Sequence, residues 1–179
     1  MHPFRTIPYL SERVWGGTRL TPPGSPPIGE SWLVGPWSRT GGGPAPDATL
    51  DELAAVHGAR LVGNDARWPD RFPFLAKLLD PAEWLSIQVH PDDEQAQRLE
   101  GPGGVGKTEA WYVLEAEPGA AILLGIRPDV PPAAVLAGIR RGDLAGLLVR
   151  RTVSAGEAYP VPAGTIHAVG PGALLYEVQ

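Results

Sequence analysis

The sequence predicts a mainly β protein, a sandwich or barrel that carries a few short accessory helices. Two observations support this prediction: the apolar residues gather in short runs, and Gly and Pro separate these runs. The chain has 23 glycines and 21 prolines among its 179 residues, which leaves little uninterrupted sequence for long helices. Many short strands joined by Gly-rich turns are typical of sandwiches and barrels.

Six segments have the composition of short strands, because they are rich in apolar, β-branched or aromatic residues. In chain order they span residues 31–34, 74–79, 84–89, 110–114, 120–126 and 173–178. Since these segments are spread over most of the chain, we expect strands to form the body of the fold.

Capping patterns predict where the first two helices lie. Thr49 and Glu52 form a capping-box pattern, so a short helix should begin there and end at Gly58. Asp92 can cap a second helix that runs to about Glu100. Both helices are short enough to be accessories to a β fold.

Two further helical segments are expected in the second half of the chain. Pro131 and Pro132 suit the first turn of a helix, and Gly142 would end it. Asp143 could then cap one or two more turns that continue through Leu148.

Composition limits the function classes. The net charge is -5, with Arg and Lys scattered along the chain, so we expect no nucleic-acid or anionic-membrane partner. The absence of cysteine excludes disulfides, thiolate metal ligands and a cysteine nucleophile. No signal-peptide or membrane-span pattern is visible, which predicts a cytoplasmic protein with a single domain over residues 1–179.

Two short stretches about eighty residues apart carry the main chemical information. Residues 88–92 contain Gln88 and His90, and residues 162–167 end at His167. With Glu109 they offer two imidazoles, a carboxylate and an amide oxygen, a set suited to one borderline divalent metal ion such as zinc. Gln88 and His90 would share one face of a strand, and Glu109 would enter from a neighbouring strand.

The spacing of these residues resembles known family patterns. Gly156, five residues, Pro162-Ala163-Gly164, two residues and His167 resemble the second conserved motif of cupins. Three ordered blocks are similar to the signatures of type I phosphomannose isomerases, and they lie at residues 85–93, 106–112 and 161–170. The similarity extends to residues 15–17, 28–32 and 175–179, so it covers nearly the whole chain.

The resemblance implies a cupin-type jelly-roll barrel that interconverts mannose 6-phosphate and fructose 6-phosphate with one zinc ion per chain. It implies that the zinc ligands are Gln88, His90, Glu109 and His167. Lys107 is expected to meet the phosphate or a sugar oxygen, and His90 to aid ring opening. The residue that transfers the proton stays unassigned, since a metal-bound imidazole is a poor base.

One departure from the family concerns the end of the chain. The family usually continues past the segment that closes this chain at Gln179, and that continuation holds an arginine associated with catalysis. We therefore expect a fragment, a truncated inactive form, or a minimal protein in which another subunit supplies the missing wall. A homodimer that covers the exposed sheet edge is one expectation.

Other interpretations remain beside the isomerase. A non-catalytic sugar-phosphate-binding cupin module would keep the metal without turnover. A cupin iron oxygenase is less favoured, because it usually uses more His ligands than Gln88 allows. Residues 101–108 end in Gly-Lys-Thr but lack the strand and long helix of a nucleotide-binding loop. No Gly-x-Ser-x-Gly elbow surrounds Ser31 or Ser86, which argues against a serine hydrolase.

Overall fold

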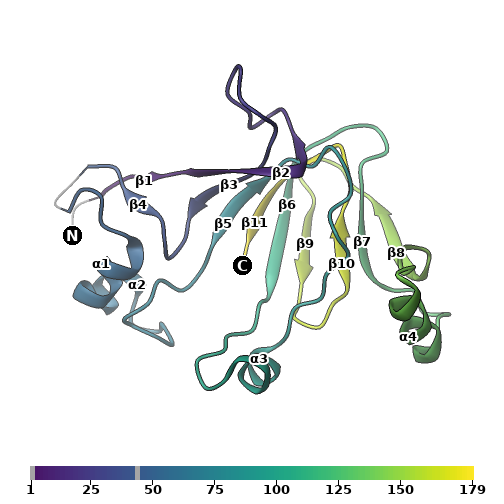
Figure 1. Ribbon diagram of the computed structural model, residues 1–179. Helices are drawn as coiled ribbons and strands as arrows, with labels where there is room; N and C mark the ends of the chain where they lie inside the picture. The colour runs from purple at the N-terminus through teal and green to yellow at the C-terminus, as the bar shows by residue number, and fades with distance from the viewer. Residues whose placement is uncertain (1–2, 43–44) are drawn as a thin grey trace.

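The largest sheet of the computed structural model, which describes residues 3–42 and 45–179, has six antiparallel strands (Figure 1). Its strands, in spatial order, are β2 (Tyr9–Gly17), β3 (Ile28–Val34), β5 (Ala76–Leu79), β11 (Ala173–Val178), β6 (Glu109–Ala116) and β9 (Ala158–Val161). The last segment of the chain thus lies in the interior of this sheet, between β5 and β6.

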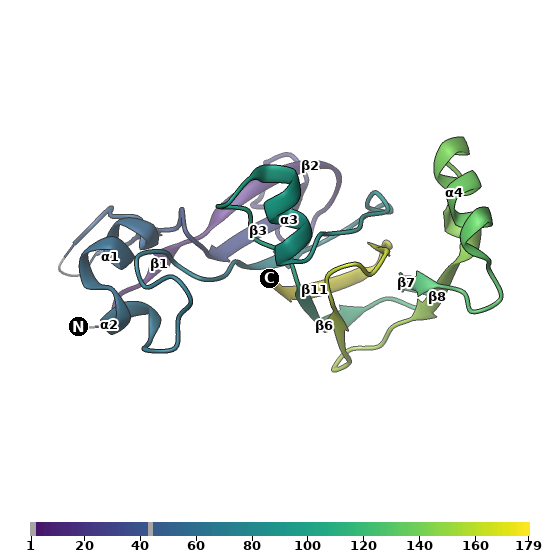
Figure 2. The same ribbon diagram turned by 90° about the horizontal axis from the view of Figure 1, so that it is seen from below.

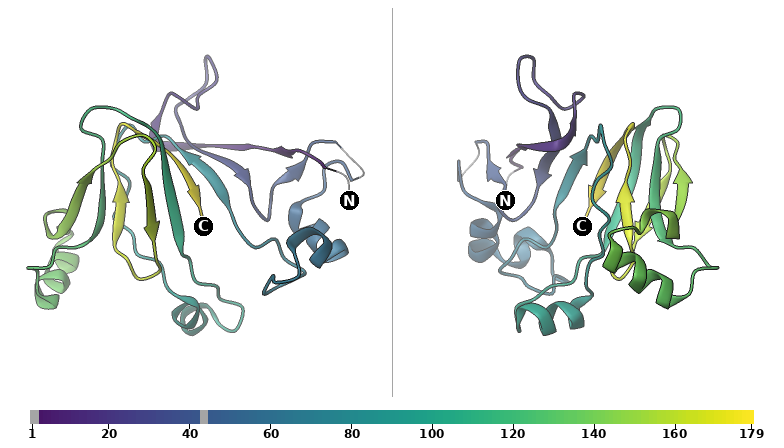
Figure 3. Two further views of the ribbon diagram at one scale, coloured as in Figure 1. Left: turned by 180° about the vertical axis from the view of Figure 1, so that it is seen from behind. Right: turned by 45° about the vertical axis from the view of Figure 1, so that its right-hand side comes forward.

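A three-stranded antiparallel sheet faces the larger one. It has the order β10 (His167–Val169), β7 (Ala121–Ile126) and β8 (Leu148–Thr152). A separate two-stranded ribbon pairs β1 (Thr6–Ile7) with β4 (Arg39–Thr40). Figure 3 shows the strands of the two larger sheets running side by side through the middle of the molecule.

The main core lies between these two sheets, because its buried side chains come from both. Its members are Leu79, Trp111, Val113, Ala120, Ile122, Val153, Val161, Val169, Ala173 and Leu175. Along β6 the side chains alternate between buried and exposed, as expected for a strand with one face on the core. The same alternation places Glu109, Trp111 and Val113 on the inner face.

The helices lie at the periphery. They are α1 (Leu50–His57), α2 (Ala59–Val62), α3 (Asp93–Glu100), α4 (Pro132–Arg141) and the 3-10 turn η1 (Ala145–Leu147). Figures 1 and 2 show α1 and α2 at the end of the molecule near the N-terminus, and α4 at the opposite end. None of the helices in the described ranges is both long and apolar enough to span a membrane.

The prediction of a mainly β protein with short accessory helices is confirmed. The capping box of Thr49 and Glu52 begins α1, Asp92 caps α3, and Gly142 in the left-handed conformation ends α4. Five predicted strands are present: β3, β5, β6 and β7 with shifted ends, and β11 with the predicted bounds. The patterns of β2, β8, β9 and β10 were too short or too polar to predict.

The predicted strand at residues 84–89 is wrong. Leu85 donates a backbone hydrogen bond to Val169, and Gln88 exchanges two with His167, but no ladder joins these two points. Between these two points the segment advances three residues, from Leu85 to Gln88, while β10 advances two, from Val169 to His167. The extra residue breaks the register, as in a β-bulge. The segment therefore lies beside β10 with one hydrogen bond at Leu85 and one isolated bridge at Gln88.

The predicted cap at Asp143 is also wrong. Its backbone N–H donates to the carbonyl of Gly138 and so takes part in the C-terminal motif of α4. The residue that precedes the 3-10 turn is Leu144, which makes no side-chain cap bond. The turn then ends at Leu147, and Leu148 begins β8.

Candidate metal centre and its cavity

Backbone pairing joins the two sequence stretches that carry the imidazoles. Gln88 and His167 exchange N–H to carbonyl hydrogen bonds of 2.8 Å in each direction. Gly164, in the turn before His167, has φ +83, a conformation that glycine adopts without strain, and its N–H donates to the carbonyl of His90. The turn thus ties the segment that ends at His90 to the start of β10.

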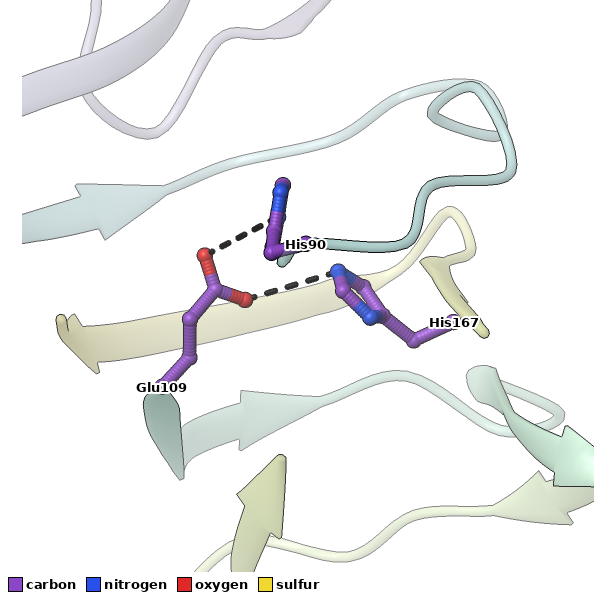
Figure 4. A group of neighbouring side chains, drawn as sticks. All are labelled: His90, Glu109 and His167. Atoms are coloured by element: carbon purple, nitrogen blue, oxygen red, sulfur yellow. Dashed lines mark ion pairs between the residues drawn. The ribbon is translucent and has the colours of Figure 1, made fainter. Parts of the chain in front are cut away.

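Glu109 lies between the two imidazoles at the start of β6. Its Oε1 is 3.5 Å from Nε2 of His90, and its Oε2 is 3.5 Å from Nε2 of His167 (Figure 4). One ligand atom from each residue lies within 4.8 Å of the other two. Glu109 is only 3% exposed, so its charge needs a partner that the two imidazoles supply only in part.

The ring of His167 is oriented by a second contact. Its Nδ1 lies 2.8 Å from the carbonyl oxygen of Thr165. Because a carbonyl can only accept, Nδ1 carries a proton, and in the neutral ring the lone pair then lies on Nε2, which is 3.5 Å from Glu109. Metal-binding histidines are commonly held in this way through their other ring nitrogen.

The donor set fits a zinc ion. Ligand atoms around a tetrahedral zinc with bonds of about 2.0–2.1 Å lie about 3.3 Å apart. Here each imidazole Nε2 lies 3.5 Å from one of the two Glu109 oxygens, and one ligand atom from each residue lies within 4.8 Å of the others. Burial lowers the pKa of His90, and the charge of Lys107 lowers this pKa further. The neutral imidazole, which is the form that binds metals, is therefore favoured.

Lys107 joins the same cluster. Its ammonium forms an ion pair with Glu109 and lies 3.2 Å from Nε2 of His90. Its backbone N–H donates to the carbonyl of Pro91, which anchors this part of the loop to the segment just after His90. Both predicted catalytic residues, Lys107 and His90, thus meet at Glu109.

Gly106→Ala is expected to destabilise the protein by about 1–3 kcal/mol, because it overpacks a tight backbone crossing. A Cβ at this position would lie 2.5 Å from backbone atoms of Asp92 and Asp93, so one of the two backbone segments must move. Gly103→Ala is the matched control, since its Cβ would meet nothing within 4 Å. Urea unfolding of both variants checks the prediction, and equal stability of the two would contradict it.

A cavity of about 210 Å³ lies beside the cluster on the inner face of the six-stranded sheet. The predicted residues that line it are Gln88, Lys107, Glu109 and His167. Four charged residues that sequence reasoning did not assign to the site also line it: Arg13, Glu30, Lys77 and Glu177.

Weak signals for these four residues were present in the sequence. Glu30 and Glu177 belong to blocks that carry the family resemblance, at residues 28–32 and 175–179. Lys77 stands alone among the apolar residues of the predicted strand 74–79. A lone charge in such a strand could have been assigned to a buried polar site, but its partners come from strands far away in the chain.

Glu177→Gln is expected to shift the pH dependence of stability. Burial raises the pKa of the Glu177 carboxyl above its ordinary value of 4.5. Its contribution to stability is therefore full below that value and is lost as pH rises through the folded pKa. The variant cannot ionise, so its stability relative to the wild type should increase as pH rises from the ordinary pKa of a Glu through the raised pKa of Glu177.

Urea unfolding at several pH values measures this difference between variant and wild type. The control is Glu115→Gln, whose side chain on β6 is 63% exposed, and it measures the general effect of replacing a glutamate by glutamine on this sheet. A difference between Glu177→Gln and the wild type that does not change with pH would refute the prediction.

The chain is similar to one enzyme family along most of its length. Residues 10–117 match the family model described as phosphomannose isomerase type I, catalytic domain. The mannose-6-phosphate isomerase of Streptococcus mutans is 38% identical over 179 residues, which cover 95% of this chain and 55% of that protein.

Solved structures agree in fold. The crystal structure of mannose 6-phosphate isomerase from Bacillus subtilis superposes with a TM-score of 0.87 at 36% identity, covering 100% of this chain and 58% of that one. A zinc-bound mannose 6-phosphate isomerase gives a TM-score of 0.73 at 18% identity, covering 98% of this chain and 67% of that one, and shows the shared fold. The predicted cupin-type fold is thereby confirmed. The chain spans little more than half the length of the Streptococcus and Bacillus relatives.

Proposed function

Because the chain belongs to the type I phosphomannose isomerase family, we propose that it interconverts mannose 6-phosphate and fructose 6-phosphate with one zinc ion per chain. The single observation that carries the proposal is the grouping of His90, Glu109 and His167 within 4.8 Å beside a polar cavity. We include Gln88 as a fourth ligand, since its side chain lines the same cavity.

The reaction moves a proton between two neighbouring carbons of an open-chain sugar. Zinc bound by this cluster would act as a Lewis acid that polarises a substrate oxygen. We propose that the ammonium of Lys107 donates to a sugar oxygen beside the cluster, and its contacts with Glu109 and His90 support this role. The negative charge of Glu109 makes this a poor position for the phosphate. His90 is proposed to assist ring opening at the edge of the cluster.

The charges around the cavity suit an anionic substrate. Three cations line the cavity, Arg13, Lys77 and Lys107, and three carboxyl groups face them, Glu30, Glu109 and Glu177. The walls are therefore close to neutral by themselves, and a divalent cation at the cluster would leave an excess positive charge. A dianionic phosphate ester would balance that excess. Lys77, deepest among the cations, is proposed to donate to a further substrate oxygen.

A coupled assay of mannose 6-phosphate isomerisation tests the proposal, run before and after chelation with metal content measured on the same sample. We expect turnover that chelation removes and that added zinc restores. Zinc-loaded protein without turnover would overturn the isomerase. In that case the non-catalytic sugar-phosphate module predicts thermal stabilisation by mannose 6-phosphate, which the same sample can show.

Partners and location remain proposals. The proposed ligand is a sugar phosphate, and neither nucleic acid nor a membrane is expected. The outer strands β2 and β9 leave edges that a second copy of the chain could cover, and a mass independent of concentration and equal to one chain would exclude this dimer. A cytoplasmic location can be tested by cell fractionation.

A further inference from the structure

A row of polar and aromatic side chains crosses the inner face of the large sheet. Register pairs Trp32 on β3 with Lys77 on β5, Lys77 with Glu177 on β11, and Glu177 with Trp111 on β6. Glu30 lies two residues before Trp32 on the same strand, so it projects from the same face. Lys77 is thus enclosed by neighbours from both sides of its strand.

The ammonium of Lys77 is buried between two carboxyl groups. Its side chain is 11% exposed, and Nζ lies 3.2 Å from Oε1 of Glu177 and 3.5 Å from Oε1 of Glu30. Glu177 is an imperfect partner, because Oε1 has no well-aligned hydrogen bond and Oε2 accepts from Nε1 of Trp111. Burial also raises the pKa of Glu177, which disfavours its charged form. A buried ammonium needs a dependable counter-charge.

Glu30 is the better fixed of the two carboxylates. Its Oε2 accepts hydrogen bonds from Nε1 of Trp32 at 2.8 Å and from Nη2 of Arg13 at 2.9 Å. Oε1 is therefore left facing Lys77. Although burial raises the pKa of Glu30, the charge of Lys77 and the two hydrogen bonds more than offset this effect, and its pKa is lowered.

We propose that Glu30 is a positioning residue that holds the ammonium of Lys77 at a fixed place on the cavity wall, while Trp32 and Arg13 fix the carboxylate. This proposal rests on the proposed isomerase function for its catalytic consequence. Buried ion pairs often contribute little net stability. If the network serves the reaction, the charge at residue 30 should matter more for turnover than for folding.

Two substitutions at residue 30 distinguish the effect of the side chain's charge from the effect of its size. Glu30→Gln keeps the size and loses the charge, whereas Glu30→Asp keeps the charge and shortens the side chain. We expect Glu30→Gln to lower kcat by at least about tenfold with KM within about threefold, which is the pattern of an interaction made in the transition state. Glu30→Asp should retain more turnover than Glu30→Gln. Equal turnover of Glu30→Gln and wild type, or a Gln variant better than Asp, would overturn the proposal.

A measurement without turnover tests the placement of Lys77 directly. The chain contains only two lysines, Lys77 and Lys107, so acetylation by acetic anhydride can be followed at each by mass spectrometry. Loss of the carboxylate at residue 30 removes one of the two ion pairs that hold the ammonium of Lys77. We expect Lys77 in Glu30→Gln to react at least about threefold faster than in the wild type, with Lys107 as internal reference. An unchanged ratio would refute the proposal.

The turnover assay and the acetylation assay distinguish the isomerase function from the positioning role of Glu30. If the zinc-loaded wild type shows no isomerisation but Lys77 still becomes more reactive in Glu30→Gln, the isomerase function fails and the positioning by Glu30 stands. Should Glu30→Gln not fold, Trp32→Phe removes one hydrogen bond to Glu30 and is expected to change Lys77 reactivity in the same direction by a smaller factor. No change in that folded variant counts against the proposal.

Discussion

Glu109→Gln is expected to deprive the chain of its bound zinc and, with it, of isomerase turnover. Glu109 is the one cluster member whose two oxygens each face a different imidazole at 3.5 Å. The amide carries no negative charge, and one of its two terminal atoms has no lone pair for a metal. Substitution of a residue that only hydrogen-bonds to a metal ligand lowers metal affinity by up to about a hundredfold. We expect the loss of a ligand itself to lower the affinity for zinc by more than that.

Zinc content after dialysis and a competition titration with a chromogenic chelator measure this effect. Glu115→Gln is the matched control on the same strand, because its side chain is 63% exposed and Glu115 does not line the cavity. This control should keep the zinc content and turnover of the wild type. Retention of one zinc per chain by Glu109→Gln would show that the cluster is not the metal centre.

Leu175→Ala is expected to lower the free energy of unfolding by about 2–5 kcal/mol. Leu175 is fully buried in the core between the two sheets. Its strand, β11, pairs with β5 through Leu79 and with β6 through Val113, so a cavity there adjoins two other core side chains. The neighbouring strands are held on both sides by backbone hydrogen bonds, so they can move only a little into the cavity that the substitution leaves.

Urea unfolding at constant pH measures the loss, and an unchanged m-value would show that the same structure unfolds. Leu114→Ala is the control on the neighbouring strand, because Leu114 is 39% exposed on the outer face. We expect its effect to stay within about 1 kcal/mol. Similar losses for both variants would mean that the core does not lie where the sheets face each other.

Local signals explain the predictions that succeeded. The capping box at Thr49 and the cap at Asp92 depend on contacts within one helical turn, so a short window of sequence contains all the necessary information. The strand 173–178 was predicted with its observed bounds, because both ends are marked by Gly or by the loss of apolar character. These elements needed no knowledge of distant residues.

The candidate site could be predicted from the sequence only where its residues lie in recognisable motifs. The three ordered blocks named His90, Glu109 and His167, and the fold brings these residues together. Their binding of a metal, and the role of Gln88, remain predictions. Lys107 was assigned to the phosphate or a sugar oxygen, and its contact with Glu109 now favours the sugar oxygen.

The sequence by itself thus determined the mainly β class, the N-caps of α1 and α3, and the residues of the candidate metal centre. Only the tertiary structure decided that residues 84–89 form no strand, because the extra residue against β10 depends on the partner's register. It also decided that Glu30, Lys77 and Glu177 meet on one wall of the cavity. Those three residues lie on three strands far apart in the chain, and the energy of a buried ion pair depends on the distance between its charges in space, which sequence spacing does not give.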